Sequence, residues 1–455
     1  MSEPIRHLFA TVLTRSSWPQ ELAGILPLSA LIDFLEVSHI LHIFQLTGAI
    51  PLWCWPITPS GSRLLLSEQD ASDSCCLDRF GKSMSLTCLD GKYGDLYVMA
   101  SPETLRLCLQ TSKPTHIPND HPNMKQSDVR LQTLEVVRVS RAPQRRLPRL
   151  RRRKYIVASA AGWVILAGLI ATAAVAGSWV ALAFLVIMPL TGGVVYLVHG
   201  GRPRRLGAKA DSGSRYNRLV VVTRHMNESH WQVYYGESSV VNSLLNWPLR
   251  SEPLSSRRMR TWLRMILRVL ILGQWAAAIG AAALKDWNAY LITIWIVICI
   301  FSHTFVFSAK QGVKSWLWHF ADIEMERFTT QLSSRRALLN TIIALNPDTF
   351  SIDRNGKEKL NEFDCGSLLW IDPILKAGPD RSMWEEATRQ AMIEERDLET
   401  EPPESESGSP EDQIYPSWEK VFGDRYWCKY IPEGMTMASM IRSQARLSGR
   451  FVEAK

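Results

Sequence analysis

The chain has 455 residues, enough for two or three folded units, and a net charge of +8. Its mean hydropathy of -0.06 is typical of water-soluble proteins, which excludes a chain embedded in a membrane over most of its length. The basic excess lies beside apolar stretches, a pattern typical of membrane-flanking charge, so no nucleic-acid partner is expected. The eight cysteines include no CxxC pair, which argues against a zinc knuckle and favours free thiols.

Residues 1–137 are expected to form an N-terminal cytosolic region, because charged residues interrupt its start and no signal peptide is recognisable. Within it, Leu22–Pro51 is apolar but contains Asp33 and Glu36. Each of these acids would cost roughly 2.5–3.5 kcal/mol at the centre of a bilayer. We therefore expect a helix that is buried in a folded domain or lies on the membrane surface. A fifth span is the alternative.

A basic block, residues 138–154, directly precedes the first long apolar run and contains nine Lys and Arg residues. Anionic lipids of the cytosolic leaflet are its expected partner, at about 1 kcal/mol for each basic residue near the surface. The residues predicted to face lipid headgroups are Arg145, Arg146, Arg149, Arg151, Arg152, Arg153 and Lys154.

Four apolar runs predict an α-helical integral membrane protein with four spans in two hairpins, residues 155–199 and 262–308. The runs are Tyr155–Gly177, Trp179–His199, Trp262–Leu284 and Asn288–Ser308. Basic residues flank the outer ends of all four runs, whereas the opposite turns hold only Lys285 beside Asp286. The positive-inside rule therefore places both termini and every sizeable soluble segment in the cytosol, at an endomembrane or the plasma membrane.

The cytosolic portions are expected to be mixed α/β. Hairpin signals occur around Asp90–Lys92, at 218–236 in the cytosolic loop 200–261, and within Phe350–Asn361. Leu131–Val139 predicts a further strand, and Ser238–Leu245 predicts a short helix.

Composition divides the rest of the chain into three segments. Residues 309–398 are expected to form a helical and hairpin region that ends in a charged helix, Ser382–Glu399. Helical spacing from Lys314 to Leu345 predicts that the fourth span continues as a stalk, or that a second helix returns. Residues 399–413 are rich in Pro, Ser and Glu and predict an acidic disordered linker. The tail, 414–455, is rich in aromatic residues and is expected to dock on a folded surface.

No motif predicts a catalytic, cofactor-binding or metal-binding residue, and no cofactor is expected. Glu36, His39 and His42 recur at intervals of three, but this spacing drifts around a helix and no second ligand set is evident. Asp353–Lys357 resembles the start of a calcium loop, but its glycine is fourth rather than sixth. His199–Arg202 is similar to an oxyanion loop of esterases, but no Gly-x-Ser-x-Gly motif accompanies it.

The spans contain no acidic residue. Their polar side chains include Gln274, Ser302, His303 and Thr304. Because ion-coupled carriers keep ionisable groups at mid-membrane, we interpret His303 as an interhelical hydrogen-bonding group rather than a coupling site. Small residues at intervals of four predict a tight bundle or a homo-oligomer interface in the third span. They are Gly273, Ala277 and Ala281.

Two blocks, Trp231–Leu249 and Trp370–Pro373, are similar to uncharacterised multi-pass membrane proteins of filamentous fungi. The resemblance extends from the first span to about residue 390. Its members have no assigned activity, so it implies no role for any residue here.

Three functional classes follow from this pattern. A non-enzymatic membrane scaffold or regulatory protein with cytosolic protein partners is favoured by the large cytosolic share and the acid-free spans. The first alternative is a transporter or channel subunit that acts as an oligomer. The second is a lipid-modifying enzyme at the cytosolic interface, for which His225 and His230 are the nearest candidates.

Overall fold

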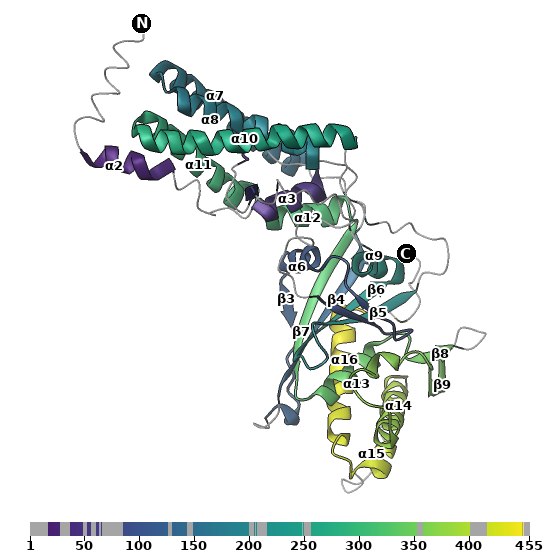
Figure 1. Ribbon diagram of the computed structural model, residues 1–455. Coiled ribbons are helices and arrows are strands. Elements are labelled where there is room, and N and C mark those ends of the chain that lie inside the picture. Colours follow the sequence, from purple (N-terminus) through teal and green to yellow (C-terminus); the bar gives the residue numbers. More distant parts are fainter. Residues whose placement is uncertain are drawn as a thin grey trace. The chain divides into compact units, whose positions relative to one another are not determined.

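The computed structural model in Figure 1 consists of two compact units, which are considered in turn. It describes residues 17–27, 37–48, 52–55, 61–62, 65, 85–125, 130–142, 149–199, 204, 206, 216–247, 249, 256–352, 358–400, 416–447 and 449. The first unit, here called the helix unit, comprises Met1–Lys82, Pro143–Arg205 and Pro248–Asp322. The second, the sheet unit, comprises Ser83–Ala142, Leu206–Trp247 and Ile323–Lys455.

The helix unit contains four helices that are long and apolar enough to cross a membrane, as predicted. They are α7 (Arg149–Ala176), α8 (Trp179–His199), α10 (Arg257–Leu284) and α11 (Trp287–Phe301), which a π-helical turn (η3, Ser302–Val306) extends. The candidate spans have 20 to 27 residues. At 1.5 Å per residue they reach about 30–40 Å, which matches or exceeds the hydrocarbon core of a bilayer.

Very short turns join these helices in pairs. Gly177 takes a positive φ of 67° between α7 and α8, and Lys285 takes a φ of 52° after α10. Asp286 then caps α11, because its carboxylate accepts a hydrogen bond from the Asn288 amide at 2.9 Å. The Asn288 side chain in turn accepts from the Ala181 amide of α8 at 2.9 Å. The turn between α10 and α11 is thus bonded to the start of α8.

Three shorter helices with described bounds also belong to the helix unit. They are α2 (Ser17–Ile25), α3 (Val37–Thr47) and α12 (Ala309–His319). The predicted apolar stretch 22–51 therefore contains parts of two helices, of 9 and 11 residues. At about 14 and 17 Å, neither α2 nor α3 could cross a hydrocarbon core of about 30 Å. Among the described residues of that stretch there is no fifth candidate span.

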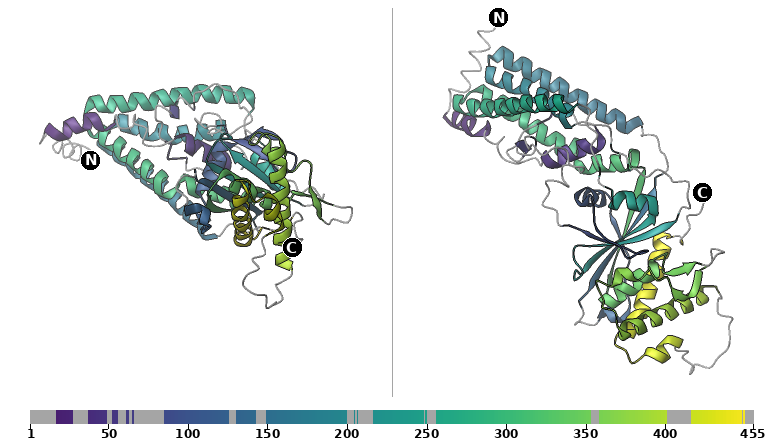
Figure 2. Two further views of the ribbon diagram at one scale, coloured as in Figure 1. Left: turned by 90° about the horizontal axis from the view of Figure 1, so that it is seen from below. Right: turned by 45° about the vertical axis from the view of Figure 1, so that its right-hand side comes forward.

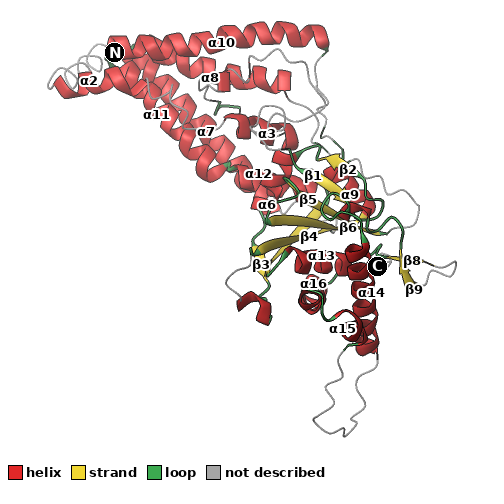
Figure 3. Cartoon of the chain, turned by 60° about the horizontal axis from the view of Figure 1, so that its bottom comes forward, coloured by secondary structure: helices red, strands yellow, loops and turns green. Residues whose placement is uncertain are grey.

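The sheet unit holds every strand that the structure describes (Figure 3, yellow). Its strands are β1 (Thr87–Asp90), β2 (Leu96–Val98), β3 (Pro114–His116), β4 (Gln132–Arg141), β5 (Asn217–Thr223), β6 (His230–Glu237) and β7 (Ile323–Leu332). They form one sheet in the order β2-β1-β5-β6-β4-β7-β3. The pairs β4–β6 and β3–β7 are parallel and the others antiparallel. A separate ribbon pairs β8 (Phe350–Ile352) with β9 (Glu358–Phe363).

Helices cover both faces of this sheet (Figures 1 and 2). One face carries α6 (Pro102–Gln110) and α9 (Ser238–Leu245). The other carries α13 (Arg335–Leu345), α14 (Pro379–Thr400) and α16 (Ile431–Ala445), with the short α15 (Ser417–Phe422) and the 3-10 turns η4 (Leu369–Ile371) and η5 (Cys428–Tyr430). A further 3-10 turn, η2 (Pro122–Lys125), precedes β4. The three predicted hairpins, the strand at Leu131–Val139 and the helix Ser238–Leu245 are thereby confirmed.

The aromatic tail docks as expected. Trp418, Trp427 and Ile431 are buried in the same core as Trp370 and Trp384, against the sheet face under α13 and α14. The predicted acidic linker, 399–413, lies outside the described residues from position 401 onward.

The predicted long helix from Lys314 to Leu345 is wrong. The structure instead has α12, which ends at His319, the strand β7, and α13, which begins at Arg335. Burial largely alternates along β7, and all ten of its residues pair with β4. That tertiary pairing outweighs the apolar spacing, which fits both a helix and a strand over short runs.

The sheet is assembled from three separate stretches of the chain. The strand β4 precedes α7, β5 and β6 lie between α8 and α10, and β7 follows α12. One end of the sheet contains the end of β4, the start of β5, the end of β6 and the start of β7. The backbone pairings there are Arg141–Ile323, Val139–Gly236 and Asn217–Glu237. The connections from β4 to α7, from α8 to β5, from β6 toward α10 and from α12 to β7 therefore all lie at one end of the sheet.

Candidate functional site

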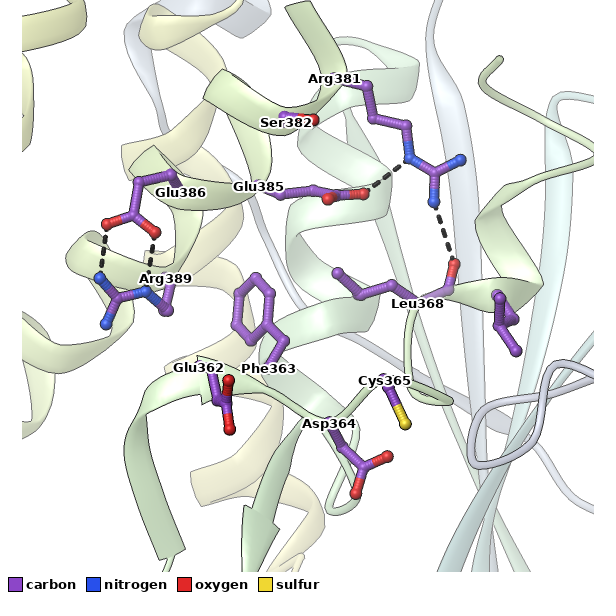
Figure 4. A pocket seen from close by; sticks show the side chains of 11 residues that line it. Glu362, Phe363, Asp364, Cys365, Leu368, Arg381, Ser382, Glu385, Glu386 and Arg389 are labelled. Atoms are coloured by element: carbon purple, nitrogen blue, oxygen red, sulfur yellow. Dashed lines mark hydrogen bonds and ion pairs between the residues drawn. The ribbon is translucent and has the colours of Figure 1, made fainter. Parts of the chain in front are cut away.

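A cavity of about 380 Å³ in the sheet unit is the candidate binding site (Figure 4). Its walls come from the end of β9, the segment 364–369 and the first three turns of α14. The segment 364–369 is held in a tight turn, because the Asp364 carboxylate accepts from the Gly366 amide at 3.0 Å and the Ser367 hydroxyl donates to the Asp364 carbonyl at 2.9 Å. The apolar part of the wall is Phe363, Leu368 and Leu369.

Arg381 at the mouth of the cavity is fully engaged with its neighbours. Its guanidinium donates to Glu385 and Asp372, both at 2.6 Å, and to the carbonyls of Leu375 and Leu368 at 2.8 and 3.3 Å. Burial alone would lower the pKa of Arg381, but the bonds to the two carboxylates outweigh it and raise the pKa. This arginine is therefore held in place as a structural cation by four hydrogen bonds.

The second cation in the wall, Arg389, is paired with Glu386 through two hydrogen bonds of 2.9 and 2.5 Å. These bonds hold the pKa of Glu386 below its ordinary value. Among the residues that the structure describes, no cationic side chain pairs with the carboxylates of Glu362 and Asp364. Four carboxylates thus line the cavity against two guanidiniums, and its net charge favours a cationic group.

The structure gives this cavity no metal-binding arrangement. Among the residues that it describes, no three His, Cys, Asp or Glu side chains are placed to hold a metal ion. Cys365 is the one exposed thiol among the six described cysteines. The site as built can bind a positively charged side chain or small molecule through Glu362 and Asp364, with Phe363 and Leu369 providing apolar contact.

The two histidines considered for interfacial chemistry lie at the β5–β6 turn and the start of β6. The imidazole Nε2 of His230 is 3.5 Å from the carboxylate of Glu135 on β4, which also accepts from Gln232 at 2.9 Å and from Arg327. Burial acts to raise the pKa of Glu135, but the hydrogen bonds from His230, Arg327 and Gln232 outweigh it and lower the pKa. His225 is exposed and lies 3.9 Å from Glu228.

The Glu135 network serves to fix α6 to the sheet. Arg327, which donates to Glu135, also donates to the carbonyls of Leu109 and Ser112 at the end of α6, at 2.7 and 3.0 Å. A cation at the carbonyl end of a helix is electrostatically favourable. We therefore assign Glu135 and Arg327 a structural role.

The polar side chains of the spans are hydrogen-bonded inside the helix unit. Gln274 of α10 donates to Thr191 of α8 at 2.8 Å, and Thr304 donates to the Ile300 carbonyl at 2.9 Å. The His303 Nε2 lies 2.8 Å from the carbonyl oxygen of Cys54. The interpretation of His303 as a hydrogen-bonding group is confirmed, but its partner is an irregular segment and not another helix.

This irregular segment, Leu52–Trp55, is a feature that sequence analysis missed. Trp53 and Cys54 are fully buried in one cluster with residues of α7, α8, α10 and α11. The Trp53 ring lies 5.6 Å from that of Trp295, and the Cys54 thiol donates to the Cys299 carbonyl at 3.5 Å.

Two glycines make room for this segment. A Cβ on Gly162 of α7 would overlap the Trp53 ring, and a Cβ on Gly192 of α8 would overlap the Leu52 carbonyl oxygen. Small residues in these helices were the only sequence signal available, and they also fit helix–helix packing. The predicted small face of α10 does pack in this way, since Gly273 faces Ile187 of α8 and Ala281 is buried with Phe184. A homo-oligomer through this face stays a prediction.

The structure separates the predicted basic block into two parts. Arg138 and Arg141 belong to β4, where they pair with Glu326 at 2.9 Å and Glu237 at 2.7 Å. Arg149, Arg151, Arg152, Arg153 and Lys154 lie in the first turns of α7, with side chains outside the described set. Arg145 and Arg146 also lie outside the described residues.

The remaining sequence motifs supply no further site. His42 is buried, and burial together with the charge of Arg204 and the neighbouring His39 lowers its pKa to about 3. Its imidazole is therefore neutral at physiological pH. Glu36 and the loop Asp353–Lys357 lie outside the described residues, and α8 ends at His199.

Comparison of the chain with models of known families, with curated proteins and with solved structures gives no match.

Proposed function

We propose that this protein crosses a membrane four times, in two helical hairpins, and displays the sheet unit in the cytosol as a non-enzymatic scaffold or regulatory module. The observation that carries the topology is that one sheet is built from three stretches of chain that the apolar helices separate.

An even number of spans separates each of these stretches from the next. The strand β4 lies before the first span, β5 and β6 lie between the second and third, and β7 lies after the fourth. Hydrogen-bonded neighbours in one sheet must lie on the same side of a bilayer, because strands cannot pair across it. Each pair of spans must then return the chain to the side from which it left, which supports two hairpins.

The charge distribution supports a cytosolic position for that side. Arg258 near the start of α10 and Lys310 and Lys314 on α12 are exposed, and the basic turns of α7 lie at the same ends of the spans. The opposite turns hold Lys285 beside Asp286. We propose that the basic residues at 145–154 contact anionic headgroups of the cytosolic leaflet.

In this arrangement Leu52–Trp55 is a re-entrant segment. Gly162 and Gly192, which it contacts, each lie about 10 Å along their helices from the basic end of the span. Irregular backbone is tolerated at such depth only when protein buries it and bonds its polar groups, as the bundle and His303 do for Cys54.

The scaffold role is supported by the state of the charged groups. In the sheet unit, ion pairs join Arg381 to Glu385 and Arg327 to Glu135. In the spans, Gln274 and His303 form hydrogen bonds within the helix unit. The transporter and lipid-modifying enzyme stay alternative hypotheses, and flux or lipid turnover by purified protein in liposomes would favour them.

Protease protection on sealed microsomes tests the topology, with tags at residue 1, within 207–215 and at residue 455. Digestion of the tags within 207–215 and at residue 455 from outside is the expected result. The tag at residue 1 tests the start of the chain separately, because the Pro19 carbonyl of α2 accepts a hydrogen bond from Tyr290, near the α10–α11 turn. Protection of that tag alone would mean that the chain crosses the membrane once more before β1. Protection of the 207–215 tag alone would refute the two-hairpin arrangement. Proximity labelling from residue 455 then tests the scaffold role, since a scaffold must enrich cytosolic proteins over a control with four unrelated spans.

A further inference from the structure

The strand β2 is an edge of the seven-stranded sheet, and no strand that the structure describes pairs with its outer side. Hydrogen bonds run from the Asp90 amide to the Asp95 carbonyl and from the Met99 amide to the Leu86 carbonyl, both at 2.9 Å. Backbone groups along an antiparallel strand point alternately toward and away from the partner. Those of Tyr97 therefore face β1, whereas the N–H and C=O groups of Leu96 and Val98 point outward from the sheet.

The side chains at this edge lack the usual protection. Exposed edges in soluble proteins are commonly blunted by lysine, proline or a bulge. Here Leu96 and Val98 are 52% and 63% exposed, and Tyr93 in the preceding turn is 54% exposed. Leu96 and Val98 pair with Leu89 and Thr87, so both lie on the face that α13 and α14 cover farther along the sheet.

The same face leads to the acidic cavity. The β1–β2 turn contacts the cavity wall, because a Cβ on Gly94 would overlap the Leu369 side chain. Leu369 is 45% exposed and lines the cavity beside Asp364. The turn is anchored by the Asn346 amide, which donates to the Gly91 carbonyl at 2.8 Å, and by Asp90, which accepts from Arg218.

We propose that β2 and the adjoining cavity form one docking site for an extended segment of a partner protein, in which a lysine or arginine is flanked by apolar residues. The backbone of the segment pairs with Leu96 and Val98 and adds a strand to the sheet. Its basic side chain enters the cavity beside Glu362 and Asp364, which form no ion pair with any arginine that the structure describes. The inference rests on the proposed function insofar as the sheet unit has a protein partner.

The test uses the full chain in nanodiscs and a fluorescein-labelled octapeptide in which valine alternates with threonine around one central lysine. Fluorescence anisotropy is expected to show saturable binding. A matched peptide with glutamate in place of lysine should bind at least tenfold more weakly, and raised salt should weaken only the lysine peptide.

Variants separate the two halves of the site. Val98→Pro removes one outward N–H while leaving the Tyr97 bonds to β1 intact, so it should weaken binding about fivefold to tenfold. Val98→Thr keeps that N–H and should bind like the wild type. Glu362→Lys should weaken the lysine peptide about tenfold, whereas Asp424→Asn, an exposed acid on another part of the unit, should change nothing. Unchanged thermal melting shows that Val98→Pro is folded.

The inference is overturned if the full chain does not bind the lysine peptide, or if Val98→Pro and Glu362→Lys bind it like the wild type. Binding that does not distinguish lysine from glutamate also overturns it. These outcomes leave the protease-protection and proximity-labelling results untouched. Conversely, a sheet unit found outside the cytosol would refute the proposed function without affecting peptide binding by the purified protein.

Discussion

Removing the positive charge of Arg218 provides a sharp test of how the β1–β2 hairpin is held. Asp90 is fully buried and accepts two hydrogen bonds from the Arg218 guanidinium and two from the amides of Lys92 and Tyr93, at 3.2 and 3.3 Å. In Arg218→Met the carboxylate keeps only the two backbone donors. A buried ion pair that loses one partner costs about 3–5 kcal/mol, because the other charge is left uncompensated.

The retained amide bonds place the expected loss at the lower end, about 3 kcal/mol. For a unit of roughly 150–250 residues, each kcal/mol lowers the melting temperature by about 2–4 °C. The expected decrease is therefore about 6–12 °C. Thermal unfolding of the full chain in detergent, followed by circular dichroism at a fixed scan rate, measures it. Hydrogen exchange of β1 and β2 should accelerate more than that of β4.

The double variant Asp90→Asn with Arg218→Met should recover about half of the lost stability, because no charge is then left buried. The reasoning is refuted if Arg218→Met melts within 2 °C of the wild type. It is also refuted if the double variant is no more stable than Arg218→Met, since the loss would then come from packing of the long arginine side chain.

Three further predictions concern the rest of the molecule. Gly162→Val should lower the yield of monodisperse protein on size-exclusion chromatography, because the valine side chain would overlap the Trp53 ring. Addition of Trp53→Ala should restore the yield, and failure to restore it would contradict the burial of Leu52–Trp55 against α7. A maleimide should label Cys365 on the folded chain far faster than the five buried described cysteines, as peptide mass spectrometry can determine; equal rates would contradict the fold. The pKa of Glu135 lies below its ordinary 4.5, so its share of the stability is present above that pH and is lost as the pH falls through the lowered value. Melting between pH 6 and 3 should therefore fall less steeply in Arg327→Met than in the wild type, and parallel curves would count against this.

Short stretches of sequence were sufficient to predict the helices that depend on apolar length and on turn residues. The uncharged run from Tyr155 onward and the helix Ser238–Leu245 are set by apolar length and by turn residues, which the structure confirms. The strand β7 was mistaken for helix, because its identity depends on pairing with β4, about 190 positions earlier. No window of sequence contains that information.

The candidate site was missed for a related reason. Glu362 lies in β9, Asp364 directly follows that strand, and Arg381 lies in the first turn of a separate helix. Each looks like an ordinary surface charge when taken alone. Which carboxylates are neutralised depends on the folded positions of both arginines. Leu52–Trp55 shows the same limit, since only the assembled bundle reveals that the glycines at 162 and 192 accommodate it.

Because apolar helices separate the strands along the chain, the sheet can be completed only late in synthesis. Strand β4 leaves the ribosome long before β7, its partner over ten residues, which is made only after all four apolar helices. At 5–20 residues per second, synthesis of the intervening chain takes roughly 10–40 s. During that interval β4, which with β7 is the longest of the described strands, has one edge without its partner and is exposed to aberrant pairing. All four apolar helices, the spans of the proposed topology, are therefore synthesised before β4 and β7 can pair.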